Sequence, residues 1–434
     1  MAVGALSAGA IALLIAGCSS TPSSTPSDKS SGSTSTAALP KSKTCTSSDD
    51  YAKTFKLGTF LPLTGSLAYL GPAAVSGSGQ ALSEIDKAGG VNGVPTCVIS
   101  TDSSDTDNPT IGDASIKQLL QAKVSAVLGA ESSSVTKNVM DQVFAAETVM
   151  LSPANTADDL SGVSKWYFRT APPNAIEANA LGNLILGDGY TKVAVLVFND
   201  AYGTNLRDGI QKVVESGGGK VVYGASGAGQ DFPSTETSFG SIVSAALATN
   251  PDAIVIDAFD QTKAIIPALA SAGWDMKKSY LIDGNLADFS KDFDPGTMTG
   301  AQATAQGVNP NDKFKATLRG WYKKNAGKSV DDFGYGAEAY DGTILMALAA
   351  QKGGSSDPAT IQKNLAAVSG TTNGTKCKTY AACLALVKGG KEIQYTGPSG
   401  VGPFNDKQDP STGYISVYKY GNNNNYTWQS SVKG

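Results

Sequence analysis

The sequence predicts an α/β protein built from two doubly wound lobes, each a parallel sheet with helices on both faces. Three observations lead to this prediction. The chain has 434 residues, which is too long for one ordinary hydrophobic core. Short apolar runs that suit buried strands alternate with stretches whose apolar residues recur at helical spacing. This alternation restarts after Pro172 and Pro173, so the two halves are expected to form two lobes rather than one sheet.

The first lobe is predicted from the alternation before Pro172. Strands are expected at residues 55–61, 96–100, 124–128 and 149–151. Helices are expected around residues 75–85, 116–120 and 139–144, where apolar side chains recur on one face, and Gly89 and Gly90 end the first of them.

The second lobe is predicted from the same pattern after Pro173. Its expected strands are residues 192–198, 221–223, 253–256 and 280–282, with helices around residues 206–214 and 265–272. The run at residues 192–198 is almost continuously apolar, which is typical of a strand buried on both faces. Two later helices, at residues 312–325 and 335–350, and an alternating strand at residues 414–418 complete the expected elements.

The composition excludes several classes of function. Histidine is absent from the chain, which removes histidine-based catalytic dyads, triads and zinc sites. The net charge of -4 gives no electrostatic reason to bind nucleic acid. We therefore expect no enzyme, no metal site, no cofactor and no nucleic-acid partner.

The N-terminal segment predicts export and lipid attachment. Residues 1–17 are mostly small and apolar and end in Leu14-Ile15-Ala16-Gly17 before Cys18, which resembles a bacterial lipobox. No Lys or Arg precedes the apolar run, which departs from the usual signal peptide. Residues 18–50 are rich in Ser, Thr and Pro and predict a tether. We expect a lipid anchor on Cys18 that holds the protein at the outer face of the cell membrane.

The remaining four cysteines predict two disulfides in an exported protein. Three pairings are possible among Cys45, Cys97, Cys377 and Cys383. We favour Cys45 with Cys97, since both lie beside the first two expected strands, and Cys377 with Cys383, which would close a short loop.

Polar residues follow several expected strands at their carboxyl ends, where doubly wound sheets bind ligands. In the first lobe these are Ser132, Ser133 and Ser134, placed where a helix begins, and the segment at residues 152–156. Serine hydroxyls and free backbone N–H groups at a helix start can receive a carboxylate. In the second lobe the corresponding segments contain Tyr202, Phe259 and Asp283.

With these segments in order, the chain resembles the solute-binding proteins of ABC transporters for branched-chain and related amino acids, which have the type I periplasmic-binding fold. The resemblance runs from about residue 55 to residue 420. It is carried by residues 58–65, 88–93, 129–134, 152–156, 168–170, 200–203, 339–342 and 395–400, together with Pro403 and Phe404.

The resemblance implies a role for each site residue. Ser133 and Ser132 would hold a ligand carboxylate, the Ala154 carbonyl and the Thr156 hydroxyl would bind the amino group or the carboxylate, and Tyr202 would cover the ligand. Asp283 would face the ammonium group. Leu70 stands where branched-chain receptors have an aromatic residue, and Phe259 lies near another pocket position, so strict branched-chain specificity is not implied.

The resemblance also implies a hinge and partners. The first lobe would comprise residues 51–171 and 306–397, and the second residues 172–305 and 398–434. The chain would cross between them near residues 171–173, 305–306 and 397–402, which makes a three-crossing hinge. The implied partners are a small amino-acid-like ligand and the permease subunits of an ABC importer.

Other readings of the sequence remain open. A receptor component that senses a ligand with the same fold is one alternative. Ser134 and Lys137 fit the SxxK pattern of serine enzymes, but its companion motifs are missing. Gly217–Lys220 lies between a helix and a strand, the reverse of a phosphate-binding loop.

Overall fold

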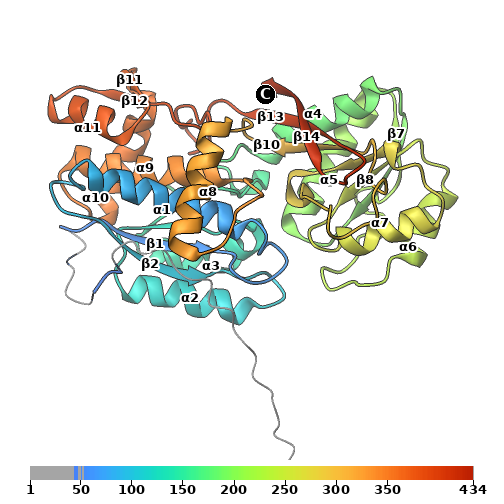
Figure 1. Cartoon of the computed structure of the whole chain (residues 1–434), viewed down its shortest axis with the longest axis horizontal. Helices are drawn as coiled ribbons and strands as arrows, with labels where there is room; N and C mark the ends of the chain where they lie inside the picture. The colour runs from blue at the N-terminus through green and yellow to red at the C-terminus, as the bar shows by residue number, and fades with distance from the viewer. Residues whose placement is uncertain (1–43, 47–49, 51–52, 434) are drawn as a thin grey trace, which may run out of the picture. The chain divides into compact units, whose positions relative to one another are not determined.

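The computed structural model describes residues 44–46, 50 and 53–433, whose strands form two large sheets and one two-stranded sheet (Figure 1). The predicted signal peptide, the lipidation site Cys18 and most of the tether lie outside the described residues. Within the described part of the chain, none of the helices combines the length and apolar character that a membrane crossing requires.

The first sheet has five parallel strands in the order β2-β1-β3-β4-β5. They are β1 (Lys56–Leu61), β2 (Cys97–Asp102), β3 (Ala126–Gly129), β4 (Val149–Ser152) and β5 (Tyr167–Arg169). Its helices are α1 (Gly71–Lys87), α2 (Pro109–Gln121) and α3 (Ser133–Ala145). Two separate apolar clusters cover the sheet, one beneath α1 and the other beneath α2 and α3, so helices cover both faces as predicted.

The second sheet has seven strands in the order β14-β13-β10-β9-β8-β6-β7. They are β6 (Lys192–Val197), β7 (Lys220–Tyr223), β8 (Ala253–Asp257), β9 (Ser279–Leu281), β10 (Gln302–Gln306), β13 (Tyr414–Tyr420) and β14 (Tyr426–Lys433). The first five are parallel, but β13 pairs antiparallel with β10 and β14 antiparallel with β13. The prediction of a parallel sheet is therefore confirmed for the centre, and the structure adds an antiparallel edge.

The helices of the second sheet are α4 (Asn174–Gly187), α5 (Ala201–Ser216), α6 (Gly240–Ala248) and α7 (Thr262–Ser271). α4 packs against α5, and α6 packs against α7. Short helical turns occur at η1 (Asp158–Leu160), η2 (Met276–Lys278), η3 (Asp283–Asn285) and η4 (Ala367–Thr371).

After β10 the chain returns to the first sheet. This part contains α8 (Asp312–Ala326), α9 (Gly336–Gly353), α10 (Pro358–Ala366) and α11 (Tyr380–Lys388), with the small sheet β11 (Thr375–Cys377) and β12 (Ile393–Tyr395). α8 and α9 both pack on α1 (Figure 1). β13 then joins the second sheet, so the described chain passes between the two large sheets after β5, after β10 and after β12.

Two of these passages lie near crossings that the sequence predicts. Gln306, predicted at a crossing, ends strand β10, and the chain leaves the second sheet only after it. Beyond β12, Phe404 still packs on Phe168 of the first sheet, although residues from 398 onward are predicted in the second lobe. The lobe boundaries remain predictions.

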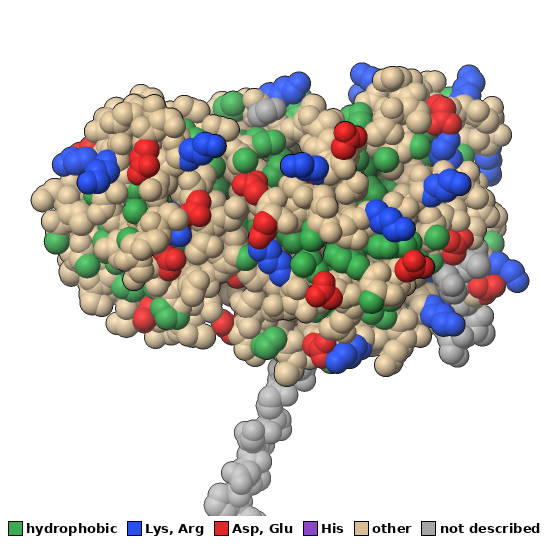
Figure 2. Space-filling view, turned by 180° about the vertical axis from the view of Figure 1, so that it is seen from behind, with side chains coloured by type: hydrophobic (Ala, Val, Ile, Leu, Met, Phe, Trp, Pro, Cys, Tyr) green, Lys and Arg blue, Asp and Glu red, His purple; other side chains and the backbone are tan. Residues whose placement is uncertain are grey.

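Both favoured disulfides are present. Cys45 bonds Cys97, with 4.9 Å between their Cα atoms, and joins the segment before β1 to the start of β2. Cys377 bonds Cys383, with 5.3 Å between their Cα atoms, and joins β11 to α11. Figure 2 shows one face of the molecule, on which basic and acidic side chains are interspersed.

Candidate functional site

A small cavity lies where loops at the carboxyl ends of strands from both sheets converge. All the predicted site residues except Thr156 line it, namely Leu70, Ser132, Ser133, Ala154, Tyr202, Phe259 and Asp283. Leu67, Glu131, Gly284 and Tyr335 complete the lining. The cavity volume is only about 20 Å³, which holds one or two water molecules.

The serine loop, residues 131–134, lies after β3 and includes the first two residues of α3. Ser132 is the N-cap of α3, and its hydroxyl oxygen accepts a hydrogen bond from Val135 N at 3.2 Å. The Ser133 hydroxyl oxygen accepts from Thr156 N at 3.4 Å and Ala157 N at 3.3 Å. Because each of these oxygens serves as an acceptor, each hydroxyl proton can still be donated to a ligand.

The loop after β4 is fastened to the serine loop. Ser152 Oγ donates to the carbonyl of Ala130 at 2.5 Å, and Asn155 Nδ2 donates to the carbonyl of Glu131 at 2.8 Å. Thr156 is buried beside the cavity rather than on its wall, and its hydroxyl has no hydrogen-bond partner among the described residues. These bonds fix the backbone from which the first-lobe side chains reach the site.

Asp283 is the acidic group of the opposite wall. It begins η3 two residues after the end of β9, and its two carboxylate oxygens accept hydrogen bonds from the hydroxyls of Tyr202 and Tyr335. Tyr202 comes from the first turn of α5, whereas Tyr335 directly precedes α9 of the first lobe. Asp283 therefore already accepts one donor from each lobe.

An aromatic pair forms another part of the wall. The rings of Tyr202 and Phe259 are stacked, with centroids 5.4 Å apart and planes inclined by 18°. Gly284 lies against this pair, and a Cβ at this position would come within 2.8 Å of the Phe259 ring and 2.9 Å of the Tyr202 hydroxyl. The backbone can approach the two rings closely only because residue 284 is glycine.

The surroundings of the cavity are rich in buried carboxyl groups. Burial, reinforced by Asp332, raises the pKa of Glu131 to about 8. Burial likewise raises the pKa of Glu338 to about 8 and that of Asp332 to about 6. Behind Asp283, burial raises the pKa of Glu177 well above its usual range, although Glu177 accepts hydrogen bonds from Asp283 N at 3.1 Å and Thr304 Oγ1 at 2.7 Å.

A sequence profile of the periplasmic binding proteins matches residues 54–382 of this chain. The chain belongs to the periplasmic binding protein family. The predicted resemblance to receptors for branched-chain amino acids, with the type I fold, is also confirmed by the relatives described next.

Among curated relatives, the chemotactic signal transduction system substrate-binding protein BasB of Halobacterium salinarum is 25% identical over 375 residues, covering 83% of this chain and 85% of that protein. Leu/Ile/Val-binding protein homolog 3 of Brucella melitensis is 28% identical over 165 residues, which is 37% of this chain and 44% of the relative.

The fold is shared with solved structures of other proteins, of which two differ in the ligand they hold. LivJ of Streptococcus pneumoniae, in complex with isoleucine, is 22% identical with a TM-score of 0.68 and covers 88% of this chain and 100% of its own. A solute-binding protein of Rhodopseudomonas palustris HaA2, in complex with p-hydroxybenzoic acid, is 20% identical with a TM-score of 0.69, covering 88% of this chain and 97% of its own. The ligands of proteins with this fold thus range from amino acids to aromatic acids.

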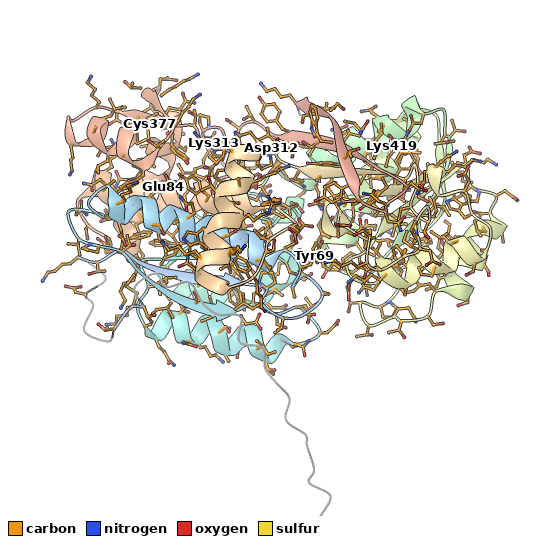
Figure 3. The ribbon with its side chains drawn as sticks, viewed as in Figure 1. Tyr69, Glu84, Asp312, Lys313, Cys377 and Lys419 are labelled. Atoms are coloured by element: carbon orange, nitrogen blue, oxygen red, sulfur yellow. A yellow bond between two sulfur atoms is a disulfide. The ribbon has the colours of Figure 1, made fainter. Side chains whose placement is uncertain are left out.

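The sequence does not predict a binding role for three residues at or beside the cavity of this periplasmic binding protein. Glu131 belongs to a segment that the sequence singled out, but only its serines were assigned a role. Tyr335 was predicted only as the start of a helix. Tyr69, which is labelled in Figure 3, precedes Leu70. Its hydroxyl donates to the carbonyl of Gly284 at 2.6 Å. An aromatic side chain thus approaches the cavity from the position next to Leu70.

The structure separates the two residues of the SxxK pattern. Ser134 Oγ accepts a hydrogen bond from Ala201 N of the second lobe at 3.1 Å, whereas Lys137 forms an ion pair with Asp159. Ser134 thus connects the lobes rather than pairing with a lysine base. Within the described part of the chain, no cluster of Cys, Asp or Glu has the composition of a metal site.

Proposed function

We propose that this protein is the extracytoplasmic, lipid-anchored substrate-binding subunit of an ABC importer. It would capture a small amino acid or a related amide or organic acid by closing its two lobes around it. The observation that carries this proposal is that Ser132 and Ser133 from one lobe and Asp283 from the other line the same cavity. A ligand that contacts both walls would stabilise the closed arrangement.

The ammonium group of the ligand would bind at Asp283. There it would replace the hydroxyl of Tyr335, which now donates to one carboxylate oxygen, while Tyr202 keeps the other. A charge-assisted hydrogen bond of this kind contributes about 1.5–3 kcal/mol. The serine hydroxyls would donate to the polar group at the far end of the ligand, and the stacked Tyr202 and Phe259 rings would cover its body.

Closure would follow from the difference in affinity between the open and closed arrangements. Only the closed arrangement brings the serine loop and Asp283 to one ligand. Because the cavity has a volume of about 20 Å³, entry of an amino acid requires the lobes to part or Tyr335 to move. The three chain passages between the sheets would form the hinge.

The proposed anchor rests on the Leu14-Ile15-Ala16-Gly17-Cys18 motif and the Ser/Thr/Pro-rich residues that follow it. Labelling of producing cells with a radioactive fatty acid tests it. The wild-type protein should take up label and fractionate with membranes, and Cys18→Ser should do neither. A labelled Cys18→Ser variant would contradict the proposal.

Calorimetric titration across amino acids, amides and organic acids tests ligand capture. Replacement of Asp283 by asparagine should abolish binding of amino compounds and spare simple carboxylates, because it removes only the partner of the ammonium group. Asp141→Asn, an exposed position on α3, is the matched control. Equal loss of both ligand classes in Asp283→Asn, or no binding of any compound to the wild type, would count against the proposal.

A ligand-sensing receptor component is the second candidate, because BasB is a substrate-binding protein of a chemotactic signal transduction system. Deletion of the gene distinguishes the two functions. Loss of uptake of the radiolabelled ligand supports the importer. Normal uptake together with loss of the behavioural response to the ligand supports the sensor.

A further inference from the structure

Glu131 is a buried carboxyl group that the proposed capture mechanism does not use. Its side chain is 3% exposed and lines the cavity, and neither carboxyl oxygen has a hydrogen-bond partner among the described residues. Its backbone is held in place, since its carbonyl accepts a hydrogen bond from Asn155 Nδ2. A buried carboxyl group without a hydrogen-bond partner destabilises the folded protein. We therefore expect Glu131 to bind a hydrogen-bond donor that comes from a ligand.

The environment of Glu131 favours a positive charge. The titratable groups that face it, from both lobes, are Tyr69, Tyr202, Asp283, Asp332, Tyr335 and Glu338. All six are acids or phenols. Neither Lys nor Arg is among the described residues that line this cavity, and Lys315 lines a neighbouring cavity beside Asp332. A ligand carboxylate placed here would add a negative charge to a site that already has several carboxyl groups.

We propose that the ligand carries two cationic nitrogens, one bound at Asp283 and the other at Glu131, and is a small aliphatic diamine or aminoalkyl guanidine. This inference rests on the proposed function, because it uses the same cavity, the same closure and the same role for Asp283, but it assigns to the cavity an amine without a carboxylate in place of an amino acid. A second ammonium group would give both unpartnered oxygens of Glu131 a donor. The stacked rings of Tyr202 and Phe259 would offer an aromatic surface that attracts cations.

Binding of such a ligand is coupled to a proton. Burial and Asp332 raise the pKa of Glu131 to about 8, so at neutral pH the carboxyl group of the empty cavity holds a proton. An ammonium group favours the ionised carboxylate, so binding releases this proton. The affinity for a diamine should therefore rise between about pH 6 and about pH 8, whereas a ligand carboxylate bonded by the protonated Glu131 would show the opposite trend.

The experiment compares 1,4-diaminobutane with butylamine by calorimetry on the full-length protein, stripped of co-purified small molecules. The panel also contains leucine, isoleucine and 4-hydroxybenzoate. The diamine should bind the wild type at least about tenfold more tightly than the monoamine, because only the diamine has a second ammonium group for Glu131. Glu131→Gln should remove this advantage, so that the diamine and the monoamine bind with similar affinity. Glu147→Gln, an exposed position that follows α3, should keep it.

Each outcome separates the inference from the proposed function. If leucine or isoleucine binds and the diamine does not, the proposed function stands and the two-cation inference fails. If none of these compounds and none of the wider panel binds, both fail. If Glu131→Gln does not fold, the inference can be tested on the wild type alone. Titration of the wild type with the diamine in buffers of different ionisation enthalpy must show release of a proton. A diamine that binds without this release would overturn the inference.

Discussion

Replacement of Asp409 by alanine should lower the stability of the protein far more than loss of a surface ion pair. Asp409 accepts a hydrogen bond from Arg169 Nε at 2.6 Å, and the two side chains are 5% and 0% exposed. The same guanidinium donates to the carbonyls of Asn155 and Ala157 and to the hydroxyl of Ser161. These neutral acceptors would remain in Asp409→Ala, but they cannot neutralise the buried charge.

The expected loss is about 3–5 kcal/mol, which is typical when one partner of a buried ion pair is removed. For a lobe of this size that corresponds to a fall in Tm of roughly 6–20 °C. Asp409→Asn should lose less, because its amide oxygen can still accept the Arg169 hydrogen bond. Lys117→Ala breaks an exposed pair, with side chains 56% and 43% exposed, and should cost about 1 kcal/mol or less.

Thermal unfolding followed by circular dichroism measures all three variants under the same conditions. A Tm of Asp409→Ala equal to that of Lys117→Ala would refute the reasoning, since it would mean that Arg169 finds water or another anion. Ligand affinity should also fall in Asp409→Ala, because Arg169 holds the loop next to Ala154 and Thr156.

Two further predictions concern disulfides and pH. Loss of the Cys45–Cys97 disulfide, which spans 52 residues, should lower the free energy of unfolding by about 4 kcal/mol, and loss of the Cys377–Cys383 disulfide, which spans 6, by about 2 kcal/mol. Urea unfolding of the two variants, each with both cysteines of one disulfide replaced by serine, measures these losses. A larger loss for Cys377–Cys383 would contradict the prediction. The free energy of unfolding of the unliganded protein should fall as the pH rises toward 8. Burial raises the pKa of Glu131 to about 8 in the folded protein, so the folded protein keeps this proton at pH values where the unfolded chain has already lost it. Glu131→Gln should reduce this slope by about 1.4 kcal/mol per pH unit in urea unfolding at several pH values, and an unchanged slope would show that the carboxyl group is ionised in the folded protein.

The sequence predicted the central strands well because burial on both faces leaves a visible pattern. β6 is a continuous apolar run, and its interior is fully buried. Strand β10, with the sequence QATAQ, gives no such signal, and it is a strand because β9 and β13 hold it on both sides. Helix α4 was missed because its apolar residues are spread around the helix rather than gathered on one face.

The sequence predicted mainly those site residues that lie just after the end of a strand. The serine loop and Asp283 each begin two residues after the end of a strand, β3 and β9, so the rule for the carboxyl ends of parallel strands identifies them. Tyr335 follows no strand, and it reaches Asp283 only because the chain returns to the first lobe. The unpartnered state of Glu131 depends on what surrounds it in space, which no local pattern in the sequence reveals.

The bridge between Cys45 and Cys97 has a mechanical consequence for a protein held by its N-terminal end. Cys45 also pairs through its backbone with Val98, so the segment that leads out of the body is fastened to an outer strand of the sheet. A force applied along the proposed tether would act on this disulfide before it acted on β1. The first strand would thus be shielded from peeling while the lobes open and close.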